Sequence, residues 1–330
     1  MALNTRPLTG KTSWPVLLLA GVEKTGKTYQ AIKASASPMV GRTFLITVGE
    51  DIPEEYAGIE GSRAEVVPHD GTYRDILRAV VEASIEPRGK DGKPNLVILD
   101  SATRVWNLLS EAAQETANER ARKKGRTVGV DGADVTVDLW NTATQRWNHI
   151  LDALRDHDGP SIVTARLDEV TVMDSAGKPT KDKHWKVQGQ KNLPYDVGAI
   201  VQLRAYGQAY ITGVRSLKFR PAPGELTPMA PDWSVDSLWR ALGLEDTKSI
   251  GDRPHAGIAP QGADAERLAL LAQVGAAADA AGVSRQDVAN TWAEQHAGQS
   301  ISEATDLGGL ELLRDDLAAK ANLNQQGDAA

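Results

Sequence analysis

The sequence has 330 residues and is 41% hydrophobic, enough for a sizeable core, and its lack of cysteine excludes disulfide scaffolds, thiolate metal sites and cysteine nucleophiles. Its net charge of −7 is uneven, because residues 246–330 hold 13 acidic and 6 basic side chains while residues 1–245 hold 31 of each. Basic clusters in the first part can therefore still attract phosphates. The early apolar run Val16 to Ala20 is too short for a membrane span, so we expect a cytoplasmic protein without membrane contact.

Apolar runs and helical periodicities alternate along the first two thirds of the chain. Strands are predicted over 16–20, 43–48, 64–67, 95–99 and 161–165, and helices over 27–35, 73–84 and 137–155, the last with Trp140 on its apolar stripe. Alternating patterns at 199–204, 209–212 and 214–219 predict antiparallel strands that close the sheet. Together they indicate an α/β fold with a mostly parallel wound sheet and antiparallel edge strands.

A composition break follows Leu244. We predict a core domain over 1–244, a flexible linker over 245–263 and a small acidic helical domain over 264–330. Helices are expected over 265–281, 286–296 and 307–321, with Ser284 and Asp287 forming a cap. We expect this domain to dock a protein partner or to regulate the chain itself, with Trp292 as a core anchor.

A phosphate-binding loop follows the first strand. It matches the pattern G-x-x-x-x-G-K-[ST] in full, as Gly21-Val22-Glu23-Lys24-Thr25-Gly26-Lys27-Thr28. Glycines let consecutive backbone N–H groups face the phosphates, and the helix behind the loop aims its positive end at the same anion. Lys27 is expected to reach the β- and γ-phosphates and Thr28 to place a hydroxyl on Mg²⁺.

Two carboxylates complete the expected ATP–magnesium site. Asp100 ends the hydrophobic strand 95–99 and is expected to hold magnesium directly or through water. Hydrolysis also needs a carboxylate that activates water. Glu50 follows the strand after the P-loop helix, at the sheet edge where ligands bind, with Asp51, Glu54 and Glu55 as alternatives.

The order of these parts resembles the RecA-like P-loop ATPases, and most closely the phage-encoded RecA-like recombinases associated with single-strand annealing. The resemblance spans about residues 14–244 and rests on the P-loop, the segment Phe44 to Glu50, the Asp100-Ser101 pair and the stretch Gln188 to Val197. It implies a RecA-like P-loop NTPase core, Glu50 as the water-activating acid and Tyr56 stacked near adenine, unless Tyr56 is a simple core or surface aromatic. Thr164-Ala165-Arg166 stands where that family carries a coupling glutamine.

The resemblance also implies homo-oligomers with nucleotide at subunit interfaces. Lys218 and Arg220 resemble a pair of cations that reaches the neighbouring subunit's ATP. The alternative is an edge strand made charged to prevent aggregation.

Two basic slots correspond to the DNA-binding loops of that family. The first holds Arg120, Arg122, Lys123, Lys124 and Arg126, and the second holds Lys178, Lys181, Lys183, Trp185 and Lys186. Lysines with an interleaved aromatic suit single-stranded DNA. The alternatives are a solvated helix end for the first slot and a charged β-hairpin, with Trp185 covering the sheet, for the second.

Three functions fit these features. The first is a DNA-stimulated ATPase of phage recombination or annealing, acting in a bacterial host's cytoplasm. The second is a hexameric helicase or loader motor on the same fold. The third is a nucleotide-switched ATPase that binds a protein partner, which the acidic C-terminal part favours.

Overall fold

The computed structural model describes residues 12–219, 226–245, 263–296 and 306–327, with the separate positions 5, 7, 300, 301 and 304. The chain forms two compact units, Met1–Arg253 and Pro254–Ala330. The division falls within the predicted linker 245–263, of which residues 246–262 lie outside the described part.

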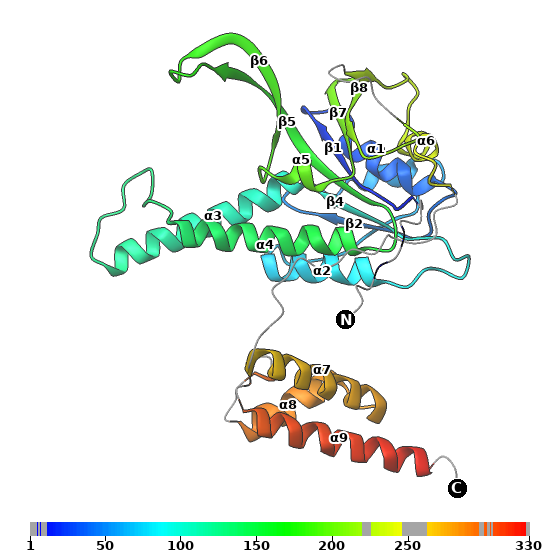
Figure 1. Cartoon of the computed structure of the whole chain (residues 1–330), viewed down its shortest axis with the longest axis vertical. Coiled ribbons are helices and arrows are strands. Elements are labelled where there is room, and N and C mark those ends of the chain that lie inside the picture. The colour runs from blue at the N-terminus through cyan, green and yellow to red at the C-terminus, as the bar shows by residue number, and fades with distance from the viewer. Residues whose placement is uncertain are drawn as a thin grey trace. The chain divides into compact units, whose positions relative to one another are not determined.

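A mixed sheet organises the first unit (Figure 1). Its strand order is β3-β2-β4-β5-β1-β7-β8-β9, with β6 paired to β5 alone. The bounds are β1 Val16–Gly21, β2 Thr43–Thr47, β3 Ala64–Val66, β4 Leu96–Asp100, β5 Ser161–Met173, β6 Pro179–Gln188, β7 Ala199–Ala205, β8 Gln208–Val214 and β9 Thr227–Pro228. The path from β3 to β7 is parallel, whereas β6, β8 and β9 pair antiparallel. This confirms the predicted α/β fold class with a mostly parallel wound sheet and antiparallel edge strands.

Helices cover both faces of the sheet because alternate side chains of its buried strands enter two different cores. Leu18 of β1 packs in the core that α2, α3 and α4 complete, while Leu17 packs in the core that α1 and α6 complete. The helices are α1 Lys27–Lys33, α2 Tyr73–Ile85, α3 Ala102–Lys123, α4 Val137–Asp156, α5 Leu193–Asp196 and α6 Val235–Ala241, with short 3-10 turns η1 Ala34–Ala36 and η2 Glu54–Gly58. The P-loop strand thus lies inside a three-layer structure.

The helices α3 and α4 run side by side and extend beyond the sheet (Figure 1). Near the sheet, Leu109 of α3 and Trp147 of α4 belong to the main core. Farther out, Ala113, Ala117 and Leu139 form a small separate apolar cluster. We call residues 113–139 the helical arm.

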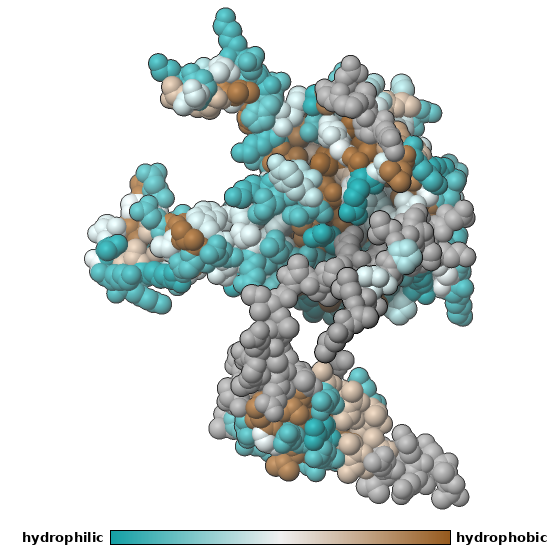
Figure 2. Space-filling model, viewed as in Figure 1, coloured by the Kyte–Doolittle hydropathy of each residue, from teal (hydrophilic) through white to brown (hydrophobic). Residues whose placement is uncertain are grey.

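The strand β5 also leaves the sheet. Its first five residues, 161–165, are buried, and exposure begins at Arg166. The strand then continues to Met173, turns, and returns as β6 in a projecting hairpin (Figure 1). We call residues 166–188 the β5–β6 hairpin. Both the hairpin and the helical arm carry mainly hydrophilic surface (Figure 2).

Several sequence predictions were wrong in detail. The predicted strand 214–219 does not form beyond Val214, because the hydroxyl of Ser216 accepts the backbone N–H groups of Lys218 and Phe219 and turns the chain. Residues 102–123 form the helix α3, which was not predicted, with Ser101 as its N-cap, so the first basic slot lies at a helix end, as one of the two alternatives held. Trp140 is 40% exposed, outside the buried stripe of α4.

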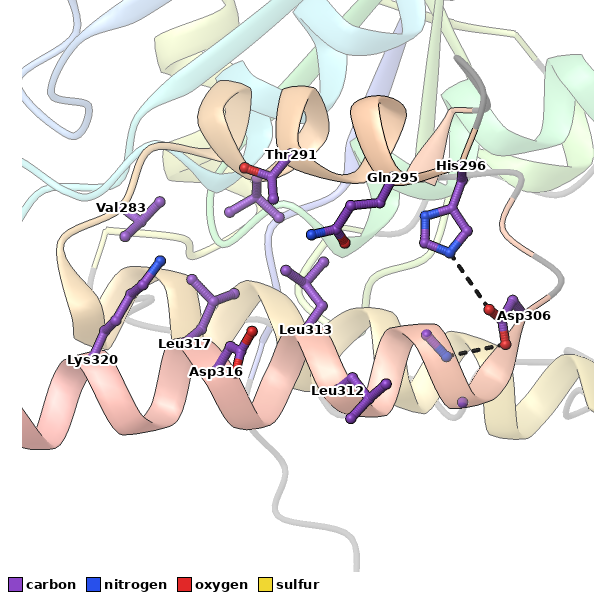
Figure 3. A pocket seen from close by; sticks show the side chains of 13 residues that line it. Val283, Thr291, Gln295, His296, Asp306, Leu312, Leu313, Asp316, Leu317 and Lys320 are labelled. Carbon is purple, nitrogen blue, oxygen red and sulfur yellow. Dashed lines mark hydrogen bonds and ion pairs between the residues drawn. The ribbon is translucent and has the colours of Figure 1, made fainter.

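The second unit is a helical domain with its own core, built from α7 Ala263–Ala281, α8 Arg285–Gln295 and α9 Leu307–Gly327. Trp292 is fully buried there, and the Ser284 hydroxyl accepts the N–H of Asp287 at 3.1 Å, so the predicted anchor and cap are confirmed. A cavity of about 540 Å³ opens between α8 and α9, with an ion pair of His296 and Asp306 at its rim (Figure 3). Within the described residues, none of the helices combines the length and the apolar character that crossing a bilayer requires.

Candidate active site

The P-loop Gly21–Thr28 connects β1 to α1 at the carboxyl edge of the sheet. Gly26 has φ of +93° and precedes the first turn of α1, a conformation that favours glycine. The Thr25 hydroxyl and the Lys27 ammonium each donate to the carbonyl oxygen of Val22 at 2.8 Å. The loop is thereby closed on itself, as a cradle for phosphates requires.

Gly21 is required by close packing. A Cβ at this position would lie 2.7 Å from the Thr25 hydroxyl and 2.9 Å from the Cβ of Leu203. The motif's first glycine therefore lets the loop approach β7, which lies next to β1 in the sheet.

The P-loop lines a cavity of about 1080 Å³, large enough for a nucleoside triphosphate. Its wall continues past Glu50 and Asp100 and along the root of the β5–β6 hairpin to Trp185. Glu23 and Lys24 line the same cavity at the exposed outer side of the loop. The P-loop residues Lys27 and Thr28 thus meet Asp100 and Glu50 around one space.

Two hydroxyl side chains from two elements converge on the buried carboxylate of Asp100. The Thr28 hydroxyl of α1 donates to Asp100 Oδ2 at 2.8 Å, and the Thr164 hydroxyl of β5 donates to Asp100 Oδ1. Asp100 is only 3% exposed. A hydroxyl and a carboxylate are oxygen ligands of the kind that Mg²⁺ prefers, so Thr28 and Asp100 fit a magnesium ion.

Lys27 is partly buried in this site. Burial lowers the pKa of its ammonium group below the usual value of 10.5, and the carboxylate of Asp100 opposes that shift. Arg166 also contributes to the lowering, while Glu50 raises the pKa. Lys27 is therefore within the electrostatic range of both carboxylates of the site.

Glu50 follows β2 and lines the cavity. Its Oε1 atom accepts from Nη2 of Arg166 at 2.8 Å and from Nε of Arg104 at 3.4 Å. Glu50 is therefore held by two guanidinium groups that the sequence analysis did not assign to the site.

Thr164 and Arg166 have a recognisable sequence signal. They alternate at the carboxyl end of the predicted strand 161–165, so their side chains share the face that meets Asp100 and Glu50. Arg104 lies on α3, which the sequence analysis did not predict, and carries no comparable signal.

Tyr56 lies in η2 and lines the cavity. Its ring packs edge-on against Tyr29 with centroids 5.8 Å apart, and it also touches the apolar core. Its placement is compatible with both alternatives drawn from the sequence, a partner for the base and a packing aromatic.

The first basic slot lies on the helical arm. Arg120, Arg122 and Lys123 belong to the last turn of α3, and Lys124 and Arg126 follow it. Arg120 pairs with Asp138 at 2.6 Å and Arg122 with Glu115 at 3.1 Å. Residues 115–138 contain five acidic side chains against these five cations, so the arm carries no net charge.

The second basic slot is the β5–β6 hairpin. Lys178 lies in its turn, and Lys181, Lys183, Trp185 and Lys186 lie on β6. Residues 166–188 hold five cations against four acids, so the hairpin keeps a positive balance of one, and Lys183 pairs with Glu169 at 2.9 Å. Trp185 packs at its root, 5.1 Å from the guanidinium of Arg204.

The predicted cation pair has a different setting. Lys218 is exposed, lies beyond the end of β8 and rests against Gly243. Arg220 lies outside the described residues.

One family model and two solved structures are similar to parts of this chain. A family model described as an AAA domain matches residues 14–225. Among solved structures, the RadB recombinase is 19% identical, with 63% of this chain aligned to 83% of that one and a TM-score of 0.36. An ATPase from the type III secretion system of pathogenic bacteria is 13% identical, with 92% of this chain aligned to 73% of that one and a TM-score of 0.33. No curated protein matches the chain.

Proposed function

The chain belongs to the AAA domain family, and from that premise we propose that it is an ATPase that hydrolyses ATP in response to single-stranded DNA. The observation that carries the nucleotide part is the convergence of Thr28 and Asp100, 2.8 Å apart, at the mouth of a complete P-loop. The observation that carries the DNA part is the positively charged hairpin whose root forms one wall of the same cavity.

The residues of the cavity suit hydrolysis of the γ-phosphate. Lys27 binds the β- and γ-phosphates, and backbone N–H groups of the P-loop hold their oxygens. A water oxygen bonds to the γ-phosphorus while the bridge to the β-phosphate breaks, Glu50 takes the proton of the water, and ADP and phosphate leave. Magnesium, when bound by Thr28 and Asp100, neutralises charge on the phosphate oxygens.

The base of the nucleotide is proposed to lie at Tyr56. The tyrosine lines the cavity, and its ring packs edge-on against Tyr29 of α1. An aromatic face suits adenine by stacking.

Single-stranded DNA is proposed to bind the hairpin rather than the arm. Lys181 and Lys186 lie on β6 with Trp185 between them, which offers cations for phosphates and an aromatic for a base. The acids of the arm balance its cations, and two of those cations are already ion-paired. Recombination or annealing in a phage-infected bacterial cytoplasm is the setting that the family resemblance supports.

Oligomers with nucleotide at the subunit interfaces form part of the proposal. Exposed Lys218 supplies a cation for a neighbouring subunit's nucleotide, and Arg220 follows it two residues later. The resemblance to cation pairs that act between subunits supports this role.

Steady-state ATP hydrolysis with and without a single-stranded oligonucleotide tests the proposal, with Lys27→Ala as the blank. We expect stimulation that disappears in Lys27→Ala. Charge reversal at Lys181 and Lys186 should weaken DNA binding. It should also reduce the slope of the logarithm of the binding constant against the logarithm of the salt concentration by roughly 0.7 per lost phosphate contact. The matched reversal at Lys123 and Lys124 of the arm should change both much less. Hydrolysis that ignores DNA, with no salt-sensitive binding, would refute the DNA part.

A nucleotide-switched ATPase that binds a protein partner is the second candidate. The cavity between α8 and α9 favours it, because apolar Leu313 and Leu317 line it together with the acidic Asp306 and Asp316. Slow hydrolysis that DNA leaves unchanged, with a partner retained only in the presence of ATP, would support this candidate. Directional unwinding of a forked duplex would instead indicate a helicase-type motor.

A further inference from the structure

Arg204 lies where the β5–β6 hairpin meets the strands β7 and β8. In β7, Leu203 packs into the core on the α1 side of the sheet, so Arg204, the next residue, faces the other side. On that side its guanidinium lies over the Trp185 ring, 5.1 Å from the ring centre, and over the Tyr210 ring, 5.3 Å from the ring centre. One aromatic of the hairpin and one of β8 therefore meet at this side chain.

The guanidinium of Arg204 is held in one orientation. Its Nε and Nη2 groups both donate to Oε1 of Gln202, at 3.0 and 2.8 Å. Its Nη1 group makes no hydrogen bond within the described residues and is not one of the buried polar atoms that lack a partner, so it is open to solvent. An anion that binds Nη1 would meet a planar group that is already ordered, so little side-chain entropy would be lost.

The positive charge of Arg204 is partly buried without a paired carboxylate in the part of the chain that the structure describes. Burial lowers the pKa of its guanidinium below the usual value of 12.5, while Tyr210 and Glu169 oppose this shift. The carboxylate of Glu169 is already occupied, because it accepts from Lys183 at 2.9 Å. A partly buried cation without a counter-ion is unfavourable, and a bound anion would offset that free energy. The surroundings of Arg204 therefore suit an anion site.

This anion site adjoins the basic surface of the hairpin. Lys183 and Trp185 are two residues apart on β6 and share a face, so the face that Lys183 occupies leads to Arg204. Arg204 does not line the nucleotide cavity, although Trp185 does. A phosphate of a polymer that follows the hairpin can therefore reach Arg204 more readily than a phosphate of the bound nucleotide.

We propose that Arg204 is a phosphate-binding residue at the root of the β5–β6 hairpin, where its fixed guanidinium takes a backbone phosphate of single-stranded DNA. This inference rests on the proposed function and extends the DNA contact from the hairpin onto β7. The phosphates of the nucleotide have the same chemistry, so the experiment measures nucleotide and DNA separately.

The test is Arg204→Gln, which removes the charge and keeps a planar group against the two rings. With an oligothymidylate as the probe, we expect binding to weaken about tenfold at low salt, because one hydrogen bond to a charged group is lost. The slope of the logarithm of the binding constant against the logarithm of the salt concentration should fall by roughly 0.7, the value for one phosphate contact. The KM for ATP and the hydrolysis rate without DNA should stay unchanged.

Arg215→Gln is the matched control. Arg215 is an exposed arginine that follows β8, beside the start of β7 rather than its end. The same change of charge there should alter neither the affinity for the oligothymidylate nor the salt slope.

Two further variants separate phosphate binding from support of the hairpin. Arg204→Lys keeps the charge but loses the planar fork, so it should keep the wild-type salt slope and recover only part of the affinity. Tyr210→Leu removes one ring and leaves the charge, so it should weaken binding without lowering the slope.

Unchanged affinity and slope in Arg204→Gln would overturn this inference and leave the proposed function intact. A slope that falls as far in Arg204→Lys and Tyr210→Leu would also overturn it and would assign Arg204 to holding the hairpin. A higher KM for ATP with normal DNA binding would overturn it in favour of the nucleotide's phosphates. If the wild-type chain shows no salt-dependent DNA binding, the DNA part of the proposed function fails, and this inference fails with it.

Discussion

Thr164 offers a sharp test of how Asp100 is held. Its hydroxyl donates to Asp100 Oδ1, and both residues are buried. Thr164→Val keeps the shape of the side chain and removes only this donor. Asp100 then keeps Thr28 as the side-chain donor on Oδ2 but loses the one on Oδ1.

The expected loss of stability follows from the charge of the acceptor. A hydrogen bond to a charged group contributes about 1.5–3 kcal/mol, so Thr164→Val should lower the free energy of unfolding of the ATPase unit by that amount. Thr43 is the matched control, because it is a buried threonine on β2 whose hydroxyl has no hydrogen-bond partner among the residues that the structure describes. Thr43→Val should be neutral or stabilising.

Urea unfolding of both variants measures the difference, and hydrolysis at varied magnesium measures the functional effect. Loss of a group that orients a metal ligand typically weakens metal affinity about 10- to 100-fold, so Thr164→Val should need correspondingly more magnesium. Equal unfolding free energies for the Thr164 and Thr43 variants would refute the assignment of this hydrogen bond. An unchanged magnesium requirement would refute the link to the metal site.

Three further predictions concern other parts of the chain. Gly21→Ala should abolish nucleotide binding, measured by nucleotide titration, and should lower the free energy of unfolding by about 1–3 kcal/mol, measured in urea. Gly129→Ala is the control and should change neither, because a Cβ at Gly129 would enter open space. Lys27→Met should unfold at a higher urea concentration than wild type at pH 7, because burial lowers the pKa of Lys27 in the folded state below 10.5. The wild-type free energy of unfolding therefore rises as the pH rises from the folded-state pKa to 10.5, and the difference between the two proteins should shrink by pH 10.5. A difference that stays constant with pH would contradict this reasoning. Trp292→Ala should destabilise the C-terminal unit by about 3–5 kcal/mol, measured as the loss of its helical unfolding transition, while Leu312→Ala, at a 71% exposed position, should be nearly silent.

The sequence was most informative where a function depends on a short segment. The P-loop is a continuous motif, and the apolar runs before it and before Asp100 placed both at the same sheet edge. That edge brings Thr28 to 2.8 Å from Asp100, although the two residues are 72 positions apart. The P-loop and Asp100 form one site because the strands that precede them are parallel and end at the same edge of the sheet.

The partners of Glu50 could not be predicted in the same way. Arg166 follows the buried part of β5, so its role depends on the strand continuing past the sheet edge as a hairpin. Arg104 depends on α3, whose apolar positions are mostly alanines and give a weak periodic signal. Both contacts with Glu50 join distant segments and need the tertiary structure.

The two basic slots show that the role of a cation cluster depends on the acidic side chains that lie close to it. Arg120 and Arg122 were predicted either to contact DNA or to belong to a solvated helix end, and each pairs with an acid, in one case with Asp138 on the following helix. The acids of the arm were visible in the sequence. Glu115 lies on the same helix as Arg122, whereas the closeness of Asp138 to Arg120 depends on the packing of α3 against α4. The hairpin keeps its excess of cations because fewer acids alternate with its lysines.

The helical arm has a consequence for how the molecule opens. Its outer part is held by the small cluster of Ala113, Ala117 and Leu139, separate from the core that holds the P-loop strand. Local unfolding needs little free energy where few apolar contacts are broken. The amide protons at the end of the arm should therefore exchange with solvent long before those of β1. An insertion or deletion there would also change the length of the arm without shifting the P-loop.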